Sequence, residues 1–400
     1  MSQPPAVNEL SAVMNVYNRL PITLIRGKGS YVWDEAGKKY LDFTSGIATC
    51  SLGHVPDTVQ DKLTEQLATL WHCSNLFTIP EQKNLANRLS QHSCCDQVFF
   101  CNSGAEANEA AIKLAKKFAK DQGKPERKEI VTFHQSFHGR TGTTMAATAQ
   151  EKIHQGFEPI APGFRYLPFN DQNALTQIDN GKTTAVLVEL IQGEGGVHPA
   201  EQDWILALQE HCQKADILLM VDEIQTGIGR TGTLFAYEQF GIKPDVITLA
   251  KGLGSGFPVG AMLAKGRVAA SFQPGSHGST FGGNPLAMTA GGATLDVMLE
   301  KEFLHEVTEK SNWLFEALQN LKDNFEGIKD VRGKGFLIGI EVDGNAGELV
   351  STFRDKGIIV LTAGQQVLRI LPPLTVSWEE MKAFIHTFNE ILAEGEYDKR

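Results

Sequence analysis

Lys251 stands between an apolar run and a glycine-rich turn. The run is Asp245-Val-Ile-Thr-Leu-Ala250 and the turn is Gly252-Leu-Gly-Ser-Gly256. At the end of a buried strand, an ammonium group is costly to desolvate unless the protein uses it. A desolvated lysine has a lowered pKa and can form a Schiff base with a carbonyl compound. The alternative is a lysine at the edge of the core whose ammonium reaches solvent.

Asp222 follows a second apolar run, Ile217-Leu-Leu-Met-Val221. A carboxylate in this position needs a cationic or hydrogen-bonding partner. A protonated pyridine nitrogen would meet that need, and the ring would then act as an electron sink. The alternative is that Asp222 caps a turn or a helix.

A third apolar run, 97–101, leads through Asn102 into Ser103, Gly104 and Ala105, which open a predicted helix. Small residues at a helix N-terminus leave backbone N–H groups open, and these groups together with the helix dipole suit a phosphate. The same residue types also form simple caps and turns. Combined with the lysine and the aspartate, the three segments offer partners for an aldehyde, a ring nitrogen and a phosphate. They predict pyridoxal 5′-phosphate as the cofactor.

Further along the chain, four side chains have types suited to binding a cofactor or a substrate. Phe137 could stack on a cofactor ring, and Arg140 could bind a carboxylate through two hydrogen bonds. Arg369 lies inside the apolar run 367–373, where a buried arginine needs a partner. Glu194, between glycines, could reach that arginine. The alternative for Phe137 and Arg140 is a core aromatic ring beside a surface arginine, and the alternative for Glu194 is a solvated loop residue.

The segment Gly227-Ile-Gly-Arg-Thr-Gly232 matches the G-x-G-x-x-G pattern of dinucleotide-binding proteins. That pattern expects a strand that turns directly through glycines into a helix, whereas 222–225 intervenes here. It also leaves Lys251 unexplained. An NAD-dependent oxidoreductase is therefore the alternative from another class of enzyme.

Short apolar runs alternate with amphipathic helical patterns in the middle of the chain, which predicts an α/β core with a mostly parallel sheet. After about residue 284 the pattern changes to two long helices and a few strands, which indicates a second, smaller lobe. We expect residues 1–60 to form a segment that packs with the small domain, 61–290 the large cofactor-binding domain and 291–400 the C-terminal small domain. The predicted strands are 97–101, 129–133, 184–188, 217–221, 246–249, 336–342 and 367–371, and the predicted helices are 105–122, 204–215, 235–240, 286–300 and 303–321.

The composition is that of an enzyme-sized chain of 400 residues with a net charge of −10. Its charges are interspersed, and no basic run indicates a nucleic acid or an anionic membrane as partner. The six cysteines form no C-x-x-C pair and no metal-like cluster, so we expect free thiols, no metal and a cytoplasmic location. Neither a signal peptide nor a membrane-spanning run is indicated.

Two long segments, 219–232 and 251–260, resemble the signature of the class III (subgroup II) pyridoxal-phosphate aminotransferases, and the similarity covers nearly the whole chain. Within this class the chain resembles the branch that acts on N-acetylornithine. The resemblance implies a fold-type I homodimer with active sites at the subunit interface. Its large domain would hold a mostly parallel seven-stranded sheet beside a smaller α+β domain.

The resemblance also implies a role for each matched residue. The residues expected to hold the cofactor are Lys251 for the Schiff base, Asp222 for the pyridine nitrogen, Gln225 near the ring hydroxyl, Phe137 against the ring, Ser103, Gly104 and Ala105 at the phosphate, and Thr280, which would serve the partner subunit's phosphate. The residues expected to bind substrates are Arg140 for a carboxylate, Arg369 for the α-carboxylate of glutamate or 2-oxoglutarate, Glu194 as a switch that pairs with Arg369, and Ser279 as a further contact.

The implied reaction moves the ω-amino group of N2-acetyl-L-ornithine to 2-oxoglutarate, giving N-acetyl-L-glutamate 5-semialdehyde and L-glutamate, a step of arginine biosynthesis. Succinylornithine, ornithine, N-succinyldiaminopimelate and 4-aminobutyrate remain alternative donors. The chain departs from the family pattern at Leu190, where relatives commonly have proline, and at 53–56, which lacks a second histidine. These departures bear on local geometry more than on the reaction.

Overall fold

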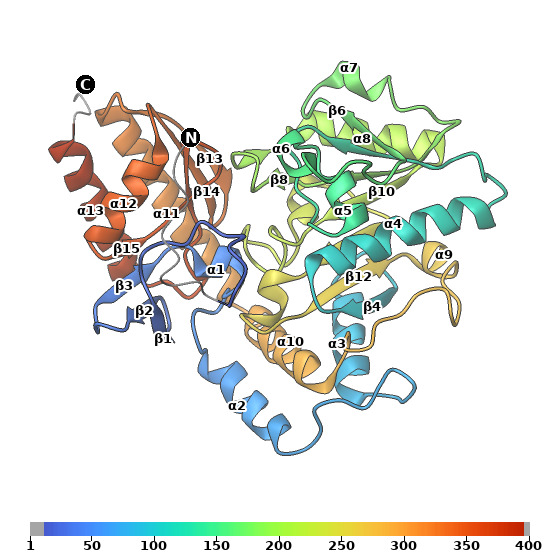
Figure 1. The fold of residues 1–400 in the computed structure, drawn as a ribbon, viewed down its shortest axis with the longest axis horizontal. Coiled ribbons are helices and arrows are strands. Elements are labelled where there is room, and N and C mark those ends of the chain that lie inside the picture. Colours follow the sequence, from blue (N-terminus) through green and yellow to red (C-terminus); the bar gives the residue numbers. More distant parts are fainter. Residues whose placement is uncertain (1–11, 396–400) are drawn as a thin grey trace.

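A seven-stranded sheet forms the centre of the molecule in the computed structural model, which describes residues 12–395 (Figure 1). All its neighbouring strands are parallel except at β12, which is antiparallel to both of its neighbours. The predicted α/β class with a mostly parallel sheet is confirmed. In spatial order the strands are β4 (Gln97–Cys101), β12 (Gly260–Ala264), β11 (Val246–Leu249), β10 (Leu218–Asp222), β7 (Thr183–Val188), β5 (Glu129–Phe133) and β6 (Phe164–Leu167).

Both faces of this sheet are covered, because alternate residues of its strands pack into different hydrophobic clusters. Val186 and Leu219 join the cluster that includes Trp204, whereas Leu187 and Met220 join the cluster that includes helix α4 (Gly104–Asp121). Burial on both faces explains why these strands read as continuous apolar runs. The other helical segments of this region are α5 (Gly142–Ala147), α6 (Glu151–His154), α7 (Gln172–Leu175), α8 (Gln202–Ala215), α9 (Gly266–Ala269) and the 3₁₀ turns η1 (Ala236–Phe240) and η2 (Lys251–Gly254).

Two four-stranded sheets lie outside the central one. The first joins N-terminal strands to β15, and Figure 1 shows its strands beside the C-terminal helices. The boundaries of the three expected segments stay predictions, and residues 1–11 of the first lie outside the described part. The first sheet contains β1 (Leu24–Lys28), β2 (Tyr31–Asp34), β3 (Lys39–Asp42) and β15 (Ile358–Ile359), and the second β13 (Ile328–Lys334), β14 (Leu337–Val342), β17 (Val367–Ile370) and β16 (Leu361–Thr362).

The remaining elements connect or cover these sheets. Helix α10 packs against both α2 and α3, below the central sheet in Figure 1. No helix among residues 12–395 is long and apolar enough to cross a membrane. These elements are α1 (Ser45–Ala48), α2 (Asp57–Leu67), α3 (Pro80–Gln91), α10 (Pro285–Met298), α11 (Phe303–Asn324), α12 (Ala346–Asp355), α13 (Trp378–Glu394) and the hairpin of β8 (Ile191–Gln192) and β9 (His198–Pro199).

The structure corrects the predicted elements at a few points. The segment expected to be helical over 235–240 is the short 3₁₀ turn η1. The predicted strand 246–249 is confirmed as β11, but Lys251 does not lie in a plain strand-to-loop turn: it opens the 3₁₀ turn η2 with a positive φ of 39°. Such a φ is unfavourable for a residue with a side chain, so backbone strain is held at the predicted chemical centre.

Candidate active site

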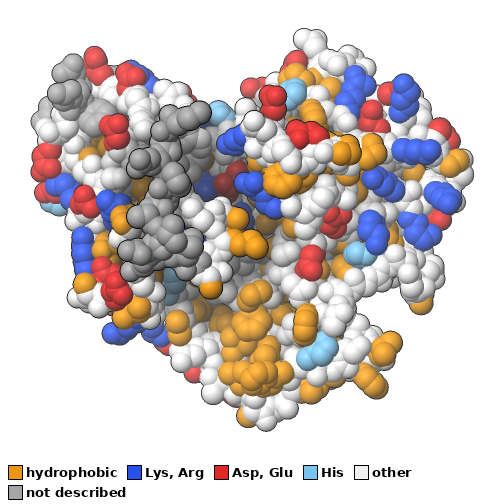
Figure 2. Space-filling view, in the orientation of Figure 1, with side chains coloured by type: hydrophobic (Ala, Val, Ile, Leu, Met, Phe, Trp, Pro, Cys, Tyr) orange, Lys and Arg blue, Asp and Glu red, His pale blue; other side chains and the backbone are white. Residues whose placement is uncertain are grey.

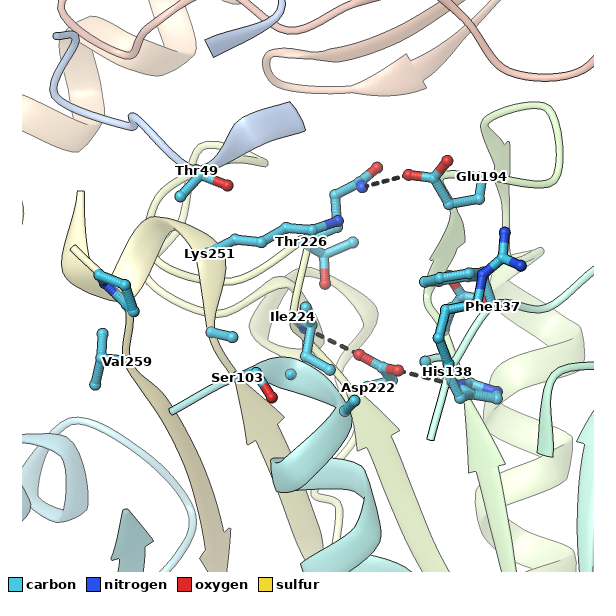
Figure 3. Close-up of a pocket in the computed structure, with 18 of the residues that line it drawn as sticks. Thr49, Ser103, Phe137, His138, Glu194, Asp222, Ile224, Thr226, Lys251 and Val259 are labelled. Atoms are coloured by element: carbon cyan, nitrogen blue, oxygen red, sulfur yellow. Dashed lines mark hydrogen bonds and ion pairs between the residues drawn. The ribbon is translucent and has the colours of Figure 1, made fainter. Parts of the chain in front are cut away.

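A cavity of about 420 Å³ lies where strands β4, β11, β10 and β7 end. These four strands run in the same direction. Strands β7, β10 and β11 pair in parallel, and β4 has the same direction because β12, which lies between β4 and β11, is antiparallel to both. Their carboxyl ends therefore meet at one edge, as expected for ligand sites in such sheets. Figure 3 shows Lys251, Asp222, Ser103 and Glu194 around this space. The predicted site residues that line it are Ser103, Gly104, Ala105, Phe137, Arg140, Glu194, Asp222, Gln225 and Lys251.

The Lys251 ammonium has no hydrogen bond or ion pair to any residue among 12–395. Burial lowers its pKa; the charges of Glu194 and Asp222 oppose that shift, whereas the charge of Arg369 adds to it. A lowered pKa increases the fraction of neutral amine, the form that attacks a carbonyl group. Lys251 is thus a lysine without a partner among the described residues, in a cavity at the strand ends, which suits the predicted role of a nucleophile.

Asp222 is buried and held by three hydrogen bonds. Its Oδ2 accepts from Asn108 Nδ2 at 2.8 Å and lies 2.8 Å from His138 Nδ1, while its Oδ1 accepts from Ile224 N at 3.0 Å. Thr248 Oγ1 donates to Asn108 Oδ1 and fixes the orientation of that amide. A carboxylate has about four acceptor positions. One position therefore remains for a donor inside the cavity.

The N-terminus of α4 forms an anion cradle on one side of Asp222. Ser103 is the N-cap, and its hydroxyl accepts from Glu106 N at 3.2 Å. The N–H groups of Gly104 and Ala105 lie in the first helical turn, where the helix supplies no acceptor. A Cβ on Gly104 would come within 2.8 Å of Ile224 Cδ1, so only glycine lets this loop approach Ile224 closely.

The buried Arg369 and the partly buried Glu194 form an ion pair beside the cavity. Arg369 donates from Nη1 to Glu194 Oε1 at 2.6 Å and from Nη2 to Oε2 at 3.2 Å. Gln225 joins them, because its Nε2 donates to Glu194 and its Oε1 accepts from Arg369. Burial alone would raise the pKa of Glu194, but the charges of Arg369 and then Lys251 lower it to about 2. The pair is charged at neutral pH.

Arg140 lies at the mouth of the cavity with its side chain exposed. Its guanidinium carbon is 5.8 Å from the centre of the Phe137 ring. It forms no ion pair with a residue among those described, so it remains available to an anion. An exposed arginine without a partner at a cavity mouth suits recognition of a carboxylate on an incoming molecule.

Besides Arg369, which lies behind Glu194, two predicted site residues, Ser279 and Thr280, do not line the cavity of their own chain. Ser279 Oγ accepts from Gly282 N at 2.9 Å and from Asn102 Nδ2 at 3.4 Å, and Thr280 is exposed. The structure therefore does not bring them together with Lys251 within one chain.

Sequence reasoning missed Glu189 and assigned no role to Asn108 or His138. Glu189 lines the cavity directly after β7, and a search for ionisable residues after every predicted strand would have found it. Asn108, on α4, and His138, in the segment after β5, support Asp222 from parts of the chain that are distant from it in the sequence. Among the described residues, no cluster of three or more His, Cys, Asp or Glu side chains could hold a metal ion.

The predicted dinucleotide pattern at 227–232 does not form the expected structure. It lies between β10 and the 3₁₀ turn η1, and no α-helix begins at its glycines. A dinucleotide site of this type needs a helix N-terminus at the glycine turn to bind the phosphates. The segment therefore gives no support to the oxidoreductase alternative.

Comparison with known proteins identifies similar chains over nearly the full length. The family model described as Aminotransferase class-III matches residues 13–392. Acetylornithine aminotransferase from Oceanobacillus iheyensis is 63% identical over 384 residues, covering 96% of each chain. The crystal structure of N-acetylornithine aminotransferase from Stenotrophomonas maltophilia has a TM-score of 0.83 at 38% identity, over 94% of this chain and 97% of that one. An ornithine aminotransferase from Toxoplasma gondii, with partial occupancy of pyridoxal phosphate at its active site, has a TM-score of 0.90 at 31% identity, over 94% and 92% of the two chains.

Proposed function

The chain belongs to the class III aminotransferases, and from this premise we propose that it transfers the ω-amino group of N2-acetyl-L-ornithine to 2-oxoglutarate. The products are N-acetyl-L-glutamate 5-semialdehyde and L-glutamate, and the reaction is a step of arginine biosynthesis. The high identity to acetylornithine aminotransferases supports this donor. The enzyme acts on small molecules, and its six free cysteines fit a cytoplasmic location.

The observation that carries the proposal is the ion pair of Arg369 and Glu194 beside Lys251. One site must accept an ω-amino side chain in one half-reaction and a dicarboxylate in the other. A buried guanidinium that Glu194 covers offers no free cation to the first substrate. When Glu194 moves away, Arg369 can bind the α-carboxylate of 2-oxoglutarate through two hydrogen bonds. A charge that is covered and uncovered gives one site two specificities.

The residues of the cavity fit pyridoxal 5′-phosphate, the cofactor of this class. Asp222 has an acceptor position free for the pyridinium N–H, and the first turn of α4 offers N–H groups to the phosphate. Lys251 has no hydrogen-bond or ion-pair partner among residues 12–395 and would bind the aldehyde. Phe137 lines the cavity and would pack on the ring. When bound, the cofactor carries the amino group between the substrates and withdraws electrons from the reacting carbon.

The chain's own residues then have distinct tasks. The Lys251 amine would accept a proton from the reacting carbon of the substrate and return it to the neighbouring carbon. Asp222, fixed by Asn108 and His138, would hold a proton on the ring nitrogen of the cofactor. Arg140 binds the carboxylate of the acetylated donor at the mouth of the cavity. The two substrates use the site in turn, so the kinetics are expected to be ping-pong.

A panel of amino donors tests the substrate. We expect kcat/KM to be highest for N-acetylornithine and lower by about 10-fold or more for ornithine, because the free α-ammonium of ornithine brings a second cation close to Arg140. The measurement is glutamate formation from 2-oxoglutarate with purified protein. A higher kcat/KM for succinylornithine, ornithine or 4-aminobutyrate would reassign the donor and leave the reaction class unchanged.

We further propose that the enzyme is a homodimer in which the partner subunit's Thr280 and Ser279 complete each site. In Figure 2 hydrophobic side chains gather over α2 and α10 on an open face. Asn75 Nδ2 binds the backbone oxygens of Ser279 and Gly282, which ties the segment after α2 to the loop that carries Thr280. An exposed apolar patch of this kind marks an association surface. Its exposed members include Leu67, Leu70, Trp71, Leu76, Phe77 and Phe281.

The double variant Trp71→Glu/Phe77→Glu tests the dimer. We expect the wild-type protein to sediment as a dimer and the variant as a monomer. The desolvation free energy of the introduced carboxylates at the interface exceeds the favourable free energy of the contacts that form there. Leu206→Glu, at an exposed leucine of α8, is the matched control and should remain dimeric. A wild-type monomer, measured by analytical ultracentrifugation, would contradict the proposal.

A further inference from the structure

Glu189 is a buried carboxyl group that lines the same cavity as Lys251 and to which the proposed reaction gives no task. It directly follows β7, and Val188 pairs with Val221 in the sheet. Glu189 therefore lies next to Asp222, one strand further from Lys251. Two carboxyl groups at adjacent strand ends share one cavity.

The two carboxyl groups have different surroundings. Asp222 has three hydrogen-bonding partners, whereas Glu189 has one, Phe137 N, which donates to its Oε2 at 3.0 Å. Its other oxygen has no partner among the described residues. Burial, and then the charge of Asp222, raise the pKa of Glu189 well above its usual value; Glu194 acts in the same direction and Lys251 opposes it. Neighbouring carboxyl groups whose surroundings differ in this way take different roles, one as a hydrogen-bond acceptor and the other as a hydrogen-bond donor.

The order of the strands fixes which side of a bound ring Glu189 would meet. The phosphate cradle follows β4, on one side of Asp222, and Glu189 follows β7, on the other. Figure 3 shows the same arrangement, with Ser103 on one side of Asp222 and Phe137 and Glu194 on the other. In pyridoxal phosphate, the ring carbons that carry the phosphate arm and the hydroxyl group lie on opposite sides of the axis from the nitrogen to the aldehyde. With the nitrogen at Asp222 and the phosphate at the cradle, the hydroxyl group must point to the β7 side.

We propose that Glu189 is a positioning residue whose neutral carboxyl group donates a hydrogen bond to the ring hydroxyl oxygen of the cofactor. This inference rests on the proposed function. It concerns a residue that sequence resemblance does not mark, since that resemblance placed Gln225 near the hydroxyl. Gln225 donates one of the two N–H groups of its Nε2 to Glu194 and accepts from Arg369 at its Oε1, so only its second N–H remains for a ligand. Glu189, in contrast, has an oxygen that is free to bind a ligand.

A hydrogen-bond donor at the ring hydroxyl oxygen changes the pH at which the visible absorbance of the loaded protein titrates. The hydroxyl oxygen shares a proton with the nitrogen that links Lys251 to the cofactor. A hydrogen bond from Glu189 stabilises negative charge on the oxygen and weakens its hold on that proton. Without the Glu189 donor, the oxygen and the nitrogen retain their shared proton up to a higher pH. The other titratable or charged groups that line the cavity with Glu189 are Asp222, Glu194, Lys251, His138 and Arg140, and all of them remain in the variants.

The experiment compares Glu189→Ala and Glu189→Gln by pH titration of the visible absorbance of the protein loaded with pyridoxal phosphate. We expect the midpoint to rise by about one pH unit in the alanine variant, the size expected for loss of one hydrogen bond to a charged oxygen. The glutamine variant keeps a neutral donor and should titrate at the wild-type midpoint. Glu189→Leu fills the space without a donor. It should match the alanine variant and replaces it if that variant does not fold.

Glu223→Gln is the matched control. Glu223 is also a buried carboxyl beside Asp222, but it binds Ala236 N and Tyr237 N and does not line the cavity. Its variant should keep the wild-type midpoint. An unchanged midpoint in both apolar variants, or an equal shift in the glutamine variant, overturns the role of Glu189. A wild-type protein with no visible band after addition of the cofactor overturns the proposed function instead, so the two failures are distinguishable.

Discussion

Replacement of Lys251 by alanine is expected to abolish the visible absorbance of the cofactor-loaded protein and to lower kcat by at least about 10³-fold. Among residues 12–395 the Lys251 ammonium has no partner, burial lowers its pKa, and no other lysine lines the cavity to take over its chemistry. General acid–base catalysis alone accounts for factors of about 10² to 10⁴. The measurements are an absorbance spectrum after removal of unbound cofactor and steady-state rates with N-acetylornithine.

Lys265 offers a control of the same residue type. It follows β12 in the same sheet, but β12 runs antiparallel, so Lys265 lies at the opposite edge, where it pairs with Asp245. Lys265→Ala should retain both the absorbance and the rate. A Lys251→Ala protein that kept normal turnover would disprove the nucleophile assignment, whereas one that lost turnover but kept a covalently bound, visible cofactor would point to a different lysine.

The sequence was informative where chemistry follows directly from the end of a parallel strand. Lys251, Asp222 and Ser103 could be grouped without any contact information, because the carboxyl ends of parallel strands meet at one edge of a sheet. The apolar runs of β7 and β10 were recognisable because both faces of those strands are buried. Thus the α/β class and most of the residues that line the candidate site could be predicted from local patterns.

Other features depend on contacts that no local pattern encodes. Strand β12 was not predicted, although its reversed direction places β4 parallel to β11 and so brings the phosphate cradle to the correct edge. Glu189 escaped notice because a single glutamate after a strand looks like an ordinary loop residue. The position of Thr280 relative to an active site depends on a second copy of the chain. The role of Thr280 therefore stays a prediction.

Replacement of Arg369 by alanine is expected to affect the two half-reactions very unequally. Arg369 gives two hydrogen bonds to a carboxylate, and each such bond to a charged group contributes about 1.5–3 kcal/mol. We expect the rate constant for the 2-oxoglutarate half-reaction at low substrate to fall by about 10²- to 10⁴-fold. The N-acetylornithine half-reaction should change by less than about 10-fold, because Glu194 covers the guanidinium during that step. Single-turnover absorbance changes measure each half-reaction separately.

Glu194→Gln should act in the opposite direction. The wild-type carboxylate competes with 2-oxoglutarate for Arg369, so an uncharged side chain lowers the cost of exposing the guanidinium, and KM for 2-oxoglutarate should fall. Because Arg369→Ala also leaves the partly buried Glu194 carboxylate without its cationic partner, the double variant Arg369→Ala/Glu194→Ala is needed to separate that effect from the loss of substrate binding. If the double variant recovers the 2-oxoglutarate half-reaction, the unpaired charge caused the defect and Arg369 is not the substrate's partner. If the defect persists while the N-acetylornithine half-reaction remains, the ion pair is the element that lets one cavity accept two substrates of different charge.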